Sequence, residues 1–235
     1  MPTLPKILNL QIGKIETFQT PNCHSGAKKQ WPSAINKRTI TGPATLTKNG
    51  VEGDEHADKQ VHGGFAKAIC VYPSEHLAFW ESELGLELHP GNFGENLTLQ
   101  NQLESNVCIG DIFQMGDAKV QITQPRQPCW KLAKFHGIKE LALKVQETGR
   151  TGWYLRVLES GTVHAGTRIT LLDRPSPIWS IAAANQLMHH DKTDFSSIEK
   201  LLTECPDLSA SWRKTFAARL TKQTPESTKN RLQFS

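Results

Sequence analysis

Residues 112–123 read IFQMGDAKVQIT and hold two short apolar runs on either side of Gly116-Asp117. Short apolar runs bounded by a turn are typical of β-strands. A two-residue connection that begins with glycine suits the tight turn of a β-hairpin. This segment therefore predicts an antiparallel hairpin, and similar segments along the chain predict a mainly β fold.

Further strands are expected from short apolar runs on both sides of this hairpin. These runs lie within residues 7–18, 68–72, 153–158 and 167–172. Many short strands separated by turns are typical of a β-barrel or sandwich. Two helices are expected to interrupt the strands, one from Ser74 to Gly85 and one that starts near Ile138 and ends at Gly149, because serine caps helices and glycine ends them.

The character of the sequence changes after residue 172. Residues 173–177 read DRPSP, hold two prolines and favour a boundary. Beyond them the apolar periods are helical, at residues 181–188, 198–202 and 208–220. We therefore expect a β-barrel-like domain over residues 1–172 and an appendage of three short helices over residues 173–235, with a loosely held polar tail from residue 221.

Composition excludes several classes of protein. The chain has 235 residues, of which 37% are hydrophobic, and no apolar run is long enough for a transmembrane helix. Its start does not resemble a secretory signal. Lysine and arginine exceed aspartate and glutamate by 27 − 23 = 4, and they are scattered, so binding to a nucleic-acid duplex is not expected. Five cysteines without a CxxC pair fit a reducing compartment, and we expect a cytoplasmic protein without membrane contact.

Three segments between the expected strands combine glycine or proline with polar side chains: residues 53–64, 91–96 and 124–131. Loops held on a rigid barrel are where sites tend to be built. In the third segment, Cys129 follows Pro125 and Pro128 and lies close to Arg126 and Lys131. Nearby cations favour the thiolate, the form that ligates metals and attacks electrophiles. Spacing alone leaves a functional and an incidental thiol equally open.

Other candidate residues have plainer interpretations. Cys70 and Cys108 lie within apolar runs and are expected to be small core residues. His62 is followed by Gly63-Gly64 and offers an imidazole beside backbone that a ligand can approach closely. A turn with a surface histidine explains the same residues.

Taken in order, these segments resemble the MOSC family, the domain type found at the C-terminus of molybdenum cofactor sulfurases. The resemblance is carried by VEGDEHADKQVHGG (residues 51–64), FGENL (93–97), SNVCIGDIF (105–113) and QPRQPCWKL (124–132). It covers about residues 5–225, and the C-terminal helices make it most similar to the YiiM-type bacterial members. It implies a MOSC β-barrel-like fold that binds the molybdenum cofactor, molybdopterin with its metal.

The resemblance also implies an activity and a set of site residues. YiiM-type members are oxidoreductases that reduce N-hydroxylated compounds to the amine, among them 6-N-hydroxylaminopurine, related bases and amidoximes, which is a detoxification. Cys129 matches the molybdenum-ligating cysteine of the family, and His62 is implied as a second catalytic residue. The cofactor-binding residues implied in this way are Lys59, His62, Gly63, Lys67, Phe93, Glu95, Asn96, Arg126, Cys129, Gly152 and Trp153.

General chemistry fits these implied roles. Cations bind phosphate by charge-assisted hydrogen bonds, so Lys59, Lys67 and Arg126 are expected near the terminal phosphate of the pterin. Amide and carboxylate groups, such as those of Asn96 and Glu95, suit the edges of the pterin ring. Gly152 and Trp153 are interpreted equally well as closing the pocket or as core residues.

The expected partners follow from what the sequence lacks. It holds no flavin or nicotinamide fingerprint, so a separate electron-donating flavin reductase is expected to serve a small N-hydroxylated substrate. A homodimer is one expected assembly. Three alternatives remain open: a sulfur carrier with a persulfide on Cys129, a hydrolase with Cys129 as nucleophile and His62 or His136 as base, and a barrel that binds a ligand without turnover.

Overall fold

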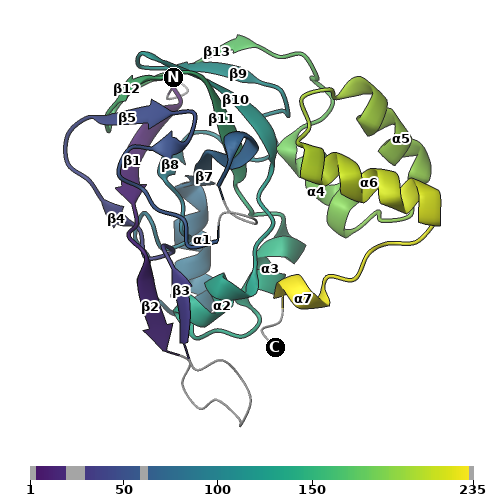
Figure 1. Cartoon of the computed structure of the whole chain (residues 1–235), viewed down its shortest axis with the longest axis horizontal. Coiled ribbons are helices and arrows are strands. Elements are labelled where there is room, and N and C mark those ends of the chain that lie inside the picture. Colours follow the sequence, from purple (N-terminus) through teal and green to yellow (C-terminus); the bar gives the residue numbers. More distant parts are fainter. Residues whose placement is uncertain (1–3, 20–29, 59–62, 233–235) are drawn as a thin grey trace.

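The structure, a computed structural model, describes residues 4–19, 30–58 and 63–232 (Figure 1). Its main feature is an eight-stranded, strongly curled sheet with the strand order β13-β9-β10-β11-β7-β8-β1-β4. The strands are β1 (Lys6–Ile12), β4 (Arg38–Thr39), β7 (Ile69–Pro73), β8 (Leu97–Gln100), β9 (Ile112–Met115), β10 (Ala118–Pro125), β11 (Trp153–Glu159) and β13 (Ile169–Asp173). The expected mainly β fold is confirmed.

Two small sheets and a parallel crossover complete this part. One small sheet joins β12 (Gly161–Val163), β5 (Ala44–Thr47) and β6 (Gly50–Val51), and the other pairs β2 (Glu16–Gln19) with β3 (Gln30–Ser33). A 3₁₀ turn, η1 (Phe65–Lys67), precedes β7. Strands β7 and β8 are parallel, so the chain must cross over between them, and it does so through α1 (Glu75–Leu84).

The predicted hairpin is present at the expected residues. Strands β9 and β10 pair antiparallel, with Met115 opposite Ala118 across the Gly116-Asp117 turn. β9 alternates between buried and half-buried residues, whereas most residues of β10 are buried. The reason is that the C-terminal helices cover the end of β10: Ser209 donates to the Thr123 carbonyl and to the Gln124 side chain.

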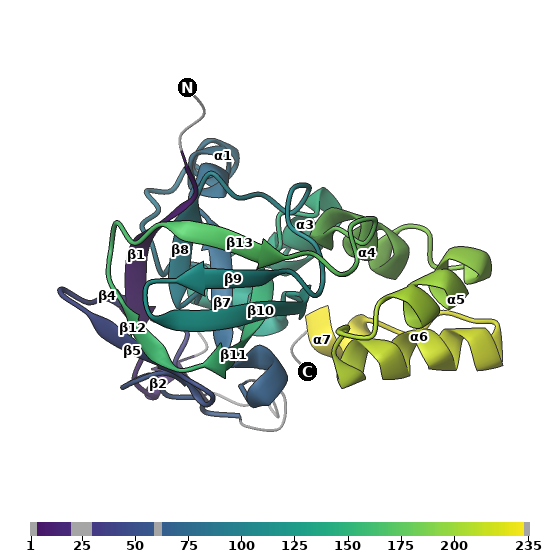
Figure 2. The same cartoon turned by 90° about the horizontal axis from the view of Figure 1, so that it is seen from above.

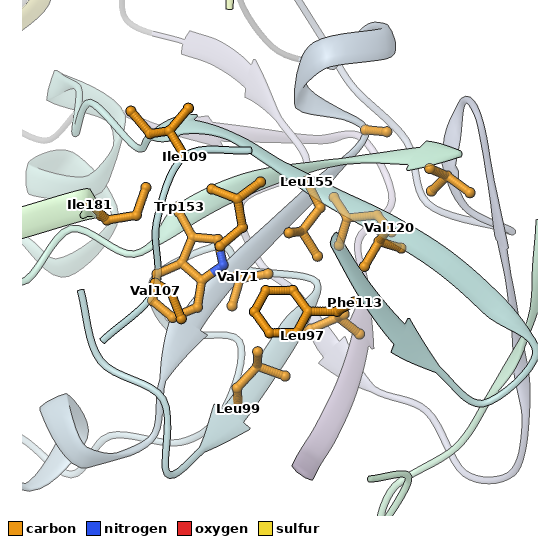
Figure 3. Close-up of a cluster of buried hydrophobic side chains, with 14 of the residues drawn as sticks. Val71, Leu97, Leu99, Val107, Ile109, Phe113, Val120, Trp153, Leu155 and Ile181 are labelled. Carbon is orange, nitrogen blue, oxygen red and sulfur yellow. The ribbon is translucent and has the colours of Figure 1, made fainter. Parts of the chain in front are cut away.

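The interior of the curled sheet is an apolar core (Figure 3). Trp153 lies in it with Val71, Leu97, Phe113 and Leu155, all of them buried. A second apolar cluster joins α1 to two helices beside the sheet, α2 (Trp130–His136) and α3 (Leu141–Thr148). The ends at Gly85 and Gly149 are as expected, with both glycines left-handed, but α3 begins at Leu141 and α2 has no counterpart in the sequence-based expectation.

The expected three-helix appendage is confirmed as α4 (Ile181–His189), α5 (Phe195–Glu204) and α6 (Ala210–Lys222) (Figure 2). Each helix begins after a residue whose side chain caps it. The side-chain oxygens of Ser180, Asp194 and Ser209 each accept the backbone amide hydrogen of the residue three positions later. The buried faces of the three helices continue the main apolar core. In the part of the chain that the structure describes, every helix is too short or too polar to cross a bilayer.

The expectation of a loose tail is wrong for residues 226–232. Glu226 forms an ion pair with the buried Arg219 at 2.7 Å, and a short helix, α7 (Lys229–Leu232), returns to the side of α2 and α3 (Figure 1). Leu232 packs against the second apolar cluster. Charged residues that looked solvated in the sequence find partners only because the chain folds back.

A pH effect on stability is expected from His189 at the end of α4. The ring is buried, neither nitrogen has a hydrogen-bond partner among the described residues, and burial followed by the nearby charges of Arg231, His190, Lys192 and Arg219 lowers its pKa to about 3. Unfolded histidine titrates near pH 6.5, so the unfolded state binds a proton that the folded state excludes, and stability falls as the pH drops below that value.

We therefore expect the free energy of unfolding to fall by about 2 kcal/mol because of His189 when the pH is lowered from 7 to 5. Urea titrations of the wild type and of His189→Leu at both pH values measure the difference. His190→Leu, a change at the exposed neighbour, is the control. An identical pH dependence in wild type and His189→Leu would contradict the burial of a neutral ring.

Candidate functional site

A pocket lies where the three polar segments of the sequence meet at one side of the sheet. Together with the open solvent at its mouth it spans about 700 Å³. Five residues expected from the sequence line it: Gly63, Lys67, Asn96, Arg126 and Cys129. They come from η1, the approach to β8 and the loop between β10 and α2, so the tertiary fold gathers segments up to 66 residues apart.

Cys129 sits at the junction between the loop and α2. It adopts an extended conformation as the residue before the helix, and its carbonyl accepts the amide hydrogen of Leu132 at 3.1 Å. The thiol is half-buried at the pocket wall, whereas Cys70, Cys108 and Cys205 are buried. Among the described cysteines, Cys129 is therefore the one that a ligand can reach most readily.

Arg126 is the most unusual charged residue of the pocket. Its side chain is only 8% exposed, and its Nη1 has no hydrogen-bond partner among the described residues. Burial lowers the pKa of Arg126, but the acidic groups around it, which are Cys70, Tyr154, Cys129 and Glu95, together outweigh burial as they ionise, so the net pKa is raised. A buried guanidinium with an unsatisfied donor is costly unless an anion completes it. The geometry thus indicates an anion site in the pocket.

Two lysines add positive charge around this anion site. Lys67 lines the pocket near Asp58, and burial lowers its pKa while the aspartate opposes that effect. Lys131, the second residue after Cys129, also lines it. Besides Lys37, which also lines the pocket but is paired with Asp54, Arg126, Lys67 and Lys131 present positive charge to a ligand, which favours a phosphate or another anionic group.

Asn96 lines the pocket but its amide is bonded to the protein. Its Oδ1 accepts the amide hydrogen of Cys70 at 3.1 Å, and its Nδ2 donates to Asp54 at 2.9 Å. Asp54 in turn pairs with Lys37 and accepts the amide hydrogen of Gly13 at 2.7 Å. Asn96 thus ties β7 and the segment around Asp54 together behind the pocket wall.

Four residues expected at the cofactor lie behind the pocket lining. Phe93 stacks on Tyr72 with ring centres 4.5 Å apart, and the buried Glu95 accepts hydrogen bonds from the amides of Gly91 and Phe93. Trp153 belongs to the main core. In each case the next position, Gly94, Asn96 or Tyr154, lines the pocket instead. For Trp153 and Tyr154 the reason is that successive residues of the strand β11 face opposite sides, whereas Phe93 and Glu95 lie in the turn before β8.

Gly152, the fourth, is required by close backbone packing. It is left-handed, with φ of +69°, and a Cβ on it would lie 2.1 Å from the Val71 carbonyl oxygen. Its amide donates to Glu104 at 2.7 Å, and its carbonyl accepts the amide hydrogen of Arg126 at 3.0 Å. Gly152 therefore acts on the site through Arg126 and does not line the pocket itself.

Two expected residues cannot be placed, because Lys59 and His62 lie outside the described residues. Their neighbour Gly63 lines the pocket and is left-handed, and a Cβ there would approach the His56 ring to 2.9 Å. The glycine thus makes room for His56, another pocket residue. His136, the alternative base for a hydrolase, instead meets the Asn92 carbonyl through Nε2 at 2.8 Å and does not line the pocket.

Sequence reasoning missed several lining residues, among them Ser33, Ala34, Ile35, Lys37, Cys70 and Tyr154; the last two are the most informative. Cys70 is buried, as expected, but it borders the pocket and contacts Tyr154, its partner across β7 and β11. Burial raises the pKa of both groups, which therefore stay protonated at neutral pH. Alternation was the available signal, since Ile69 and Val71 on either side of Cys70 face the core.

The fold and the pocket together place this chain in a class of proteins. The fold is a curled β-sheet with a three-helix extension, and the pocket brings the Cys129 thiol and the buried Arg126 together. The MOSC domain profile matches residues 58–170, and the chain belongs to the MOSC-domain family. Within that family it carries the YiiM-like, 3-alpha helix domain, which matches residues 179–223. MOSC domains are generally associated with the molybdenum cofactor.

Known relatives agree with this placement. The chain is 44% identical to YflK of Bacillus subtilis over 93% of its own length and 96% of YflK. It is homologous to YiiM of Escherichia coli, with 40% identity over 80% of this chain and 84% of YiiM. The crystal structure of that YiiM superposes with a TM-score of 0.79, at 31% identity over 98% of this chain and 99% of the other.

A third relative bears on activity. A protein of Gibberella moniliformis named as a reductase is 38% identical over 75% of this chain, which spans 31% of that longer protein. A homologue of this chain is thus named for a redox function.

Proposed function

We propose that this protein is an oxidoreductase that binds the molybdenum cofactor in the pocket and reduces N-hydroxylated compounds, such as 6-N-hydroxylaminopurine and amidoximes, to the amine. The observation that carries the proposal is the meeting of a reachable thiol, Cys129, with the unsatisfied buried guanidinium of Arg126 in one pocket. A cofactor that bears both a thiophilic metal and an anionic phosphate needs these two groups.

The residues present fit that cofactor. Cys129 would hold the metal, and Arg126 with Lys67 would hold the phosphate. When bound, the cofactor supplies the two-electron chemistry, and the protein supplies binding and orientation. The buried ion pair of Lys37 with Asp54, and the Asn96 amide bonded to that aspartate, keep the wall rigid without offering a reactive group.

The chain's own residues also limit what enters. The Cys70 thiol and the Tyr154 hydroxyl, both protonated, give the pocket a neutral polar surface next to the cations. Lys67 and Lys131 can hold an anionic group at the pocket wall, while Glu55 and Asp58 are carboxylates of the same lining that can accept or deliver protons. Electrons would come from a separate flavin reductase.

The proposal is tested by Arg126→Met. Protein purified from cells that make the cofactor is expected to contain about one molybdenum per chain, and the variant about tenfold less or lower, because a charge-assisted hydrogen bond of a buried group is lost. Elemental analysis measures the metal, and reduction of 6-N-hydroxylaminopurine and benzamidoxime with a chemical reductant measures the activity. Arg38→Met, a change at an exposed arginine, is the matched control.

The same preparation separates the alternatives. Wild-type protein that carries cyanolysable sulfur on Cys129 and no molybdenum would overturn the reductase and favour the sulfur carrier. Bound molybdenum without turnover of any N-hydroxylated compound would favour a binding role. Equal molybdenum content in wild type and Arg126→Met would remove Arg126 from the cofactor site.

A further inference from the structure

The C-terminal segment contacts the loop between β10 and α2 (residues 126–129), called here the cysteine loop. After α6 the chain leaves the three-helix domain and returns to the β domain, where α7 lies beside α3 (Figure 1). The YiiM-like helical domain ends at residue 223, so α7 lies beyond both matched domains. Its contacts with the site are therefore a feature that neither domain assigns.

Arg231 of α7 makes the decisive contacts. One terminal nitrogen of its guanidinium donates to the carbonyl of Pro128, and the other donates to the side-chain oxygen of Gln146 on α3. Pro128 directly precedes Cys129, so Arg231 donates to the peptide group that joins these two residues. Because the guanidinium is planar and makes both hydrogen bonds at once, it fixes the position and the orientation of the Pro128 carbonyl relative to α3.

The path from α6 to this contact is itself fixed. Arg219 on α6 is 1% exposed, donates to the Leu187 and Met188 carbonyls at the end of α4, and holds Glu226 by two bonds of 2.7 and 2.8 Å. Leu232 then packs on the second apolar cluster. The segment from Glu226 to Leu232 is thus held at both ends, and this fixes the position of Arg231.

The cysteine loop needs such an anchor. Pro125 and Pro128 have no amide hydrogen, so at these positions the loop can be held only through its carbonyls or its other residues. Toward the sheet, Arg126 donates its amide hydrogen to Gly152. Two residues further along, the carbonyl of Pro128 accepts from Arg231. The two contacts hold the loop at both of these positions, just before Cys129.

We propose that Arg231 is a positioning residue for Cys129, and that the three-helix domain serves the site by delivering this arginine to the cysteine loop. The inference rests on the proposed role of Cys129. Arg231 keeps the loop in the observed conformation and places a second guanidinium charge near the sulfur, in addition to that of Arg126. In accord with this, burial lowers the pKa of Arg231 while the nearby Cys129 opposes that effect.

The test uses the full chain without molybdenum and compares two reagents at Cys129. Iodoacetate is an anion and iodoacetamide is neutral, and the same thiolate displaces iodide from both, so the ratio of the two alkylation rates reports the local positive charge. Peptide mass spectrometry measures alkylation at Cys129 alone. Hydrogen exchange of residues 126–132 measures how firmly the loop is held.

In Arg231→Gln we expect the iodoacetate-to-iodoacetamide ratio to fall about two- to threefold, as a unit charge near the sulfur is removed. Exchange in residues 126–132 is expected to accelerate about tenfold. Arg231→Lys keeps the charge but not the forked pair of bonds, so it should retain the ratio and still loosen the loop. Arg213→Gln removes an arginine that, among the described residues, donates to the Leu202 and Cys205 carbonyls of the helical domain, and it should change neither readout.

An unchanged ratio together with unchanged exchange in Arg231→Gln would overturn the proposal. Should that variant fail to fold, Arg231→Lys decides alone: faster exchange in the loop supports the proposal, and wild-type exchange contradicts it. Neither readout needs the metal. Failure of the proposed function would appear instead as wild-type protein without molybdenum, so the two failures are distinguishable.

Discussion

Cys129→Ser is expected to lower the molybdenum content and the reduction of 6-N-hydroxylaminopurine by about a hundredfold or more. This magnitude follows because changes to residues that only support a metal ligand already cost 10- to 100-fold, and this change removes the ligand atom itself. A serine hydroxyl is a hard and poorly ionised donor, whereas the metal in this cofactor is thiophilic. Cys129 is the half-buried thiol at the pocket wall, so the substitution leaves the core intact.

Cys108→Ser is the matched control for this experiment. Cys108 is buried away from the pocket, and its sulfur lies 3.4 Å from the Pro177 carbonyl, a contact that a hydroxyl can replace. Elemental analysis and turnover with a chemical reductant are measured for both variants, with circular dichroism to verify folding. Equal molybdenum content and equal turnover in wild type and Cys129→Ser would show that the sulfur is not a ligand.

Gly152→Ala is expected to lower the free energy of unfolding by about 4 kcal/mol, in the exceptional range for a single substitution. The new Cβ would lie 2.1 Å from the Val71 carbonyl oxygen, and the left-handed conformation is itself strained for alanine. Relief requires β7 and β11 to separate where Trp153 pairs with Val71. Urea unfolding at neutral pH measures the loss.

Gly149→Ala separates the two causes of this loss, which are the close approach to Val71 and the strain of a left-handed alanine. Gly149 has nearly the same left-handed φ, +70°, but among the described residues no packing neighbour lies within 4 Å of the place that a Cβ would take. This substitution should cost only about 1 kcal/mol, which is the strain of the backbone conformation alone. Similar losses in both variants would show that the close approach to Val71 is absent. Because Gly152 accepts the Arg126 amide hydrogen, Gly152→Ala should also weaken binding of the cofactor.

Local patterns predicted most secondary structure correctly where one face of an element is buried. The hairpin at Gly116-Asp117 and the helix ends at Gly85 and Gly149 follow from turn and cap chemistry, which acts within a few residues. Helix α2 was missed because its seven residues span two turns of periodicity at most and follow a proline-rich loop. Its end at Gly137, which is left-handed, was the available signal.

The site was predicted less evenly. Cys129, Arg126 and Lys67 were predicted as site residues from their residue types and from the family resemblance, and all three line the pocket. Phe93 and Trp153 were assigned to the cofactor, but the structure places each one position away from a lining residue. For Trp153 in β11, a register of one residue decides which side of the strand the side chain faces, and that register depends on the neighbouring strands. Phe93 lies in the turn before β8, where its stacking on Tyr72 turns it toward the second apolar cluster.

The sequence alone therefore determined the class of fold, the three C-terminal helices, and the loop that holds Cys129. Only the tertiary structure decided that Cys70 and Tyr154 border the pocket, that Arg126 is buried with an open donor, and that Arg231 meets the carbonyl of Pro128 across 103 residues. The physical reason is range: turns, caps and periodicity act between near neighbours in the chain, whereas burial and charge pairing depend on which distant segments pack together.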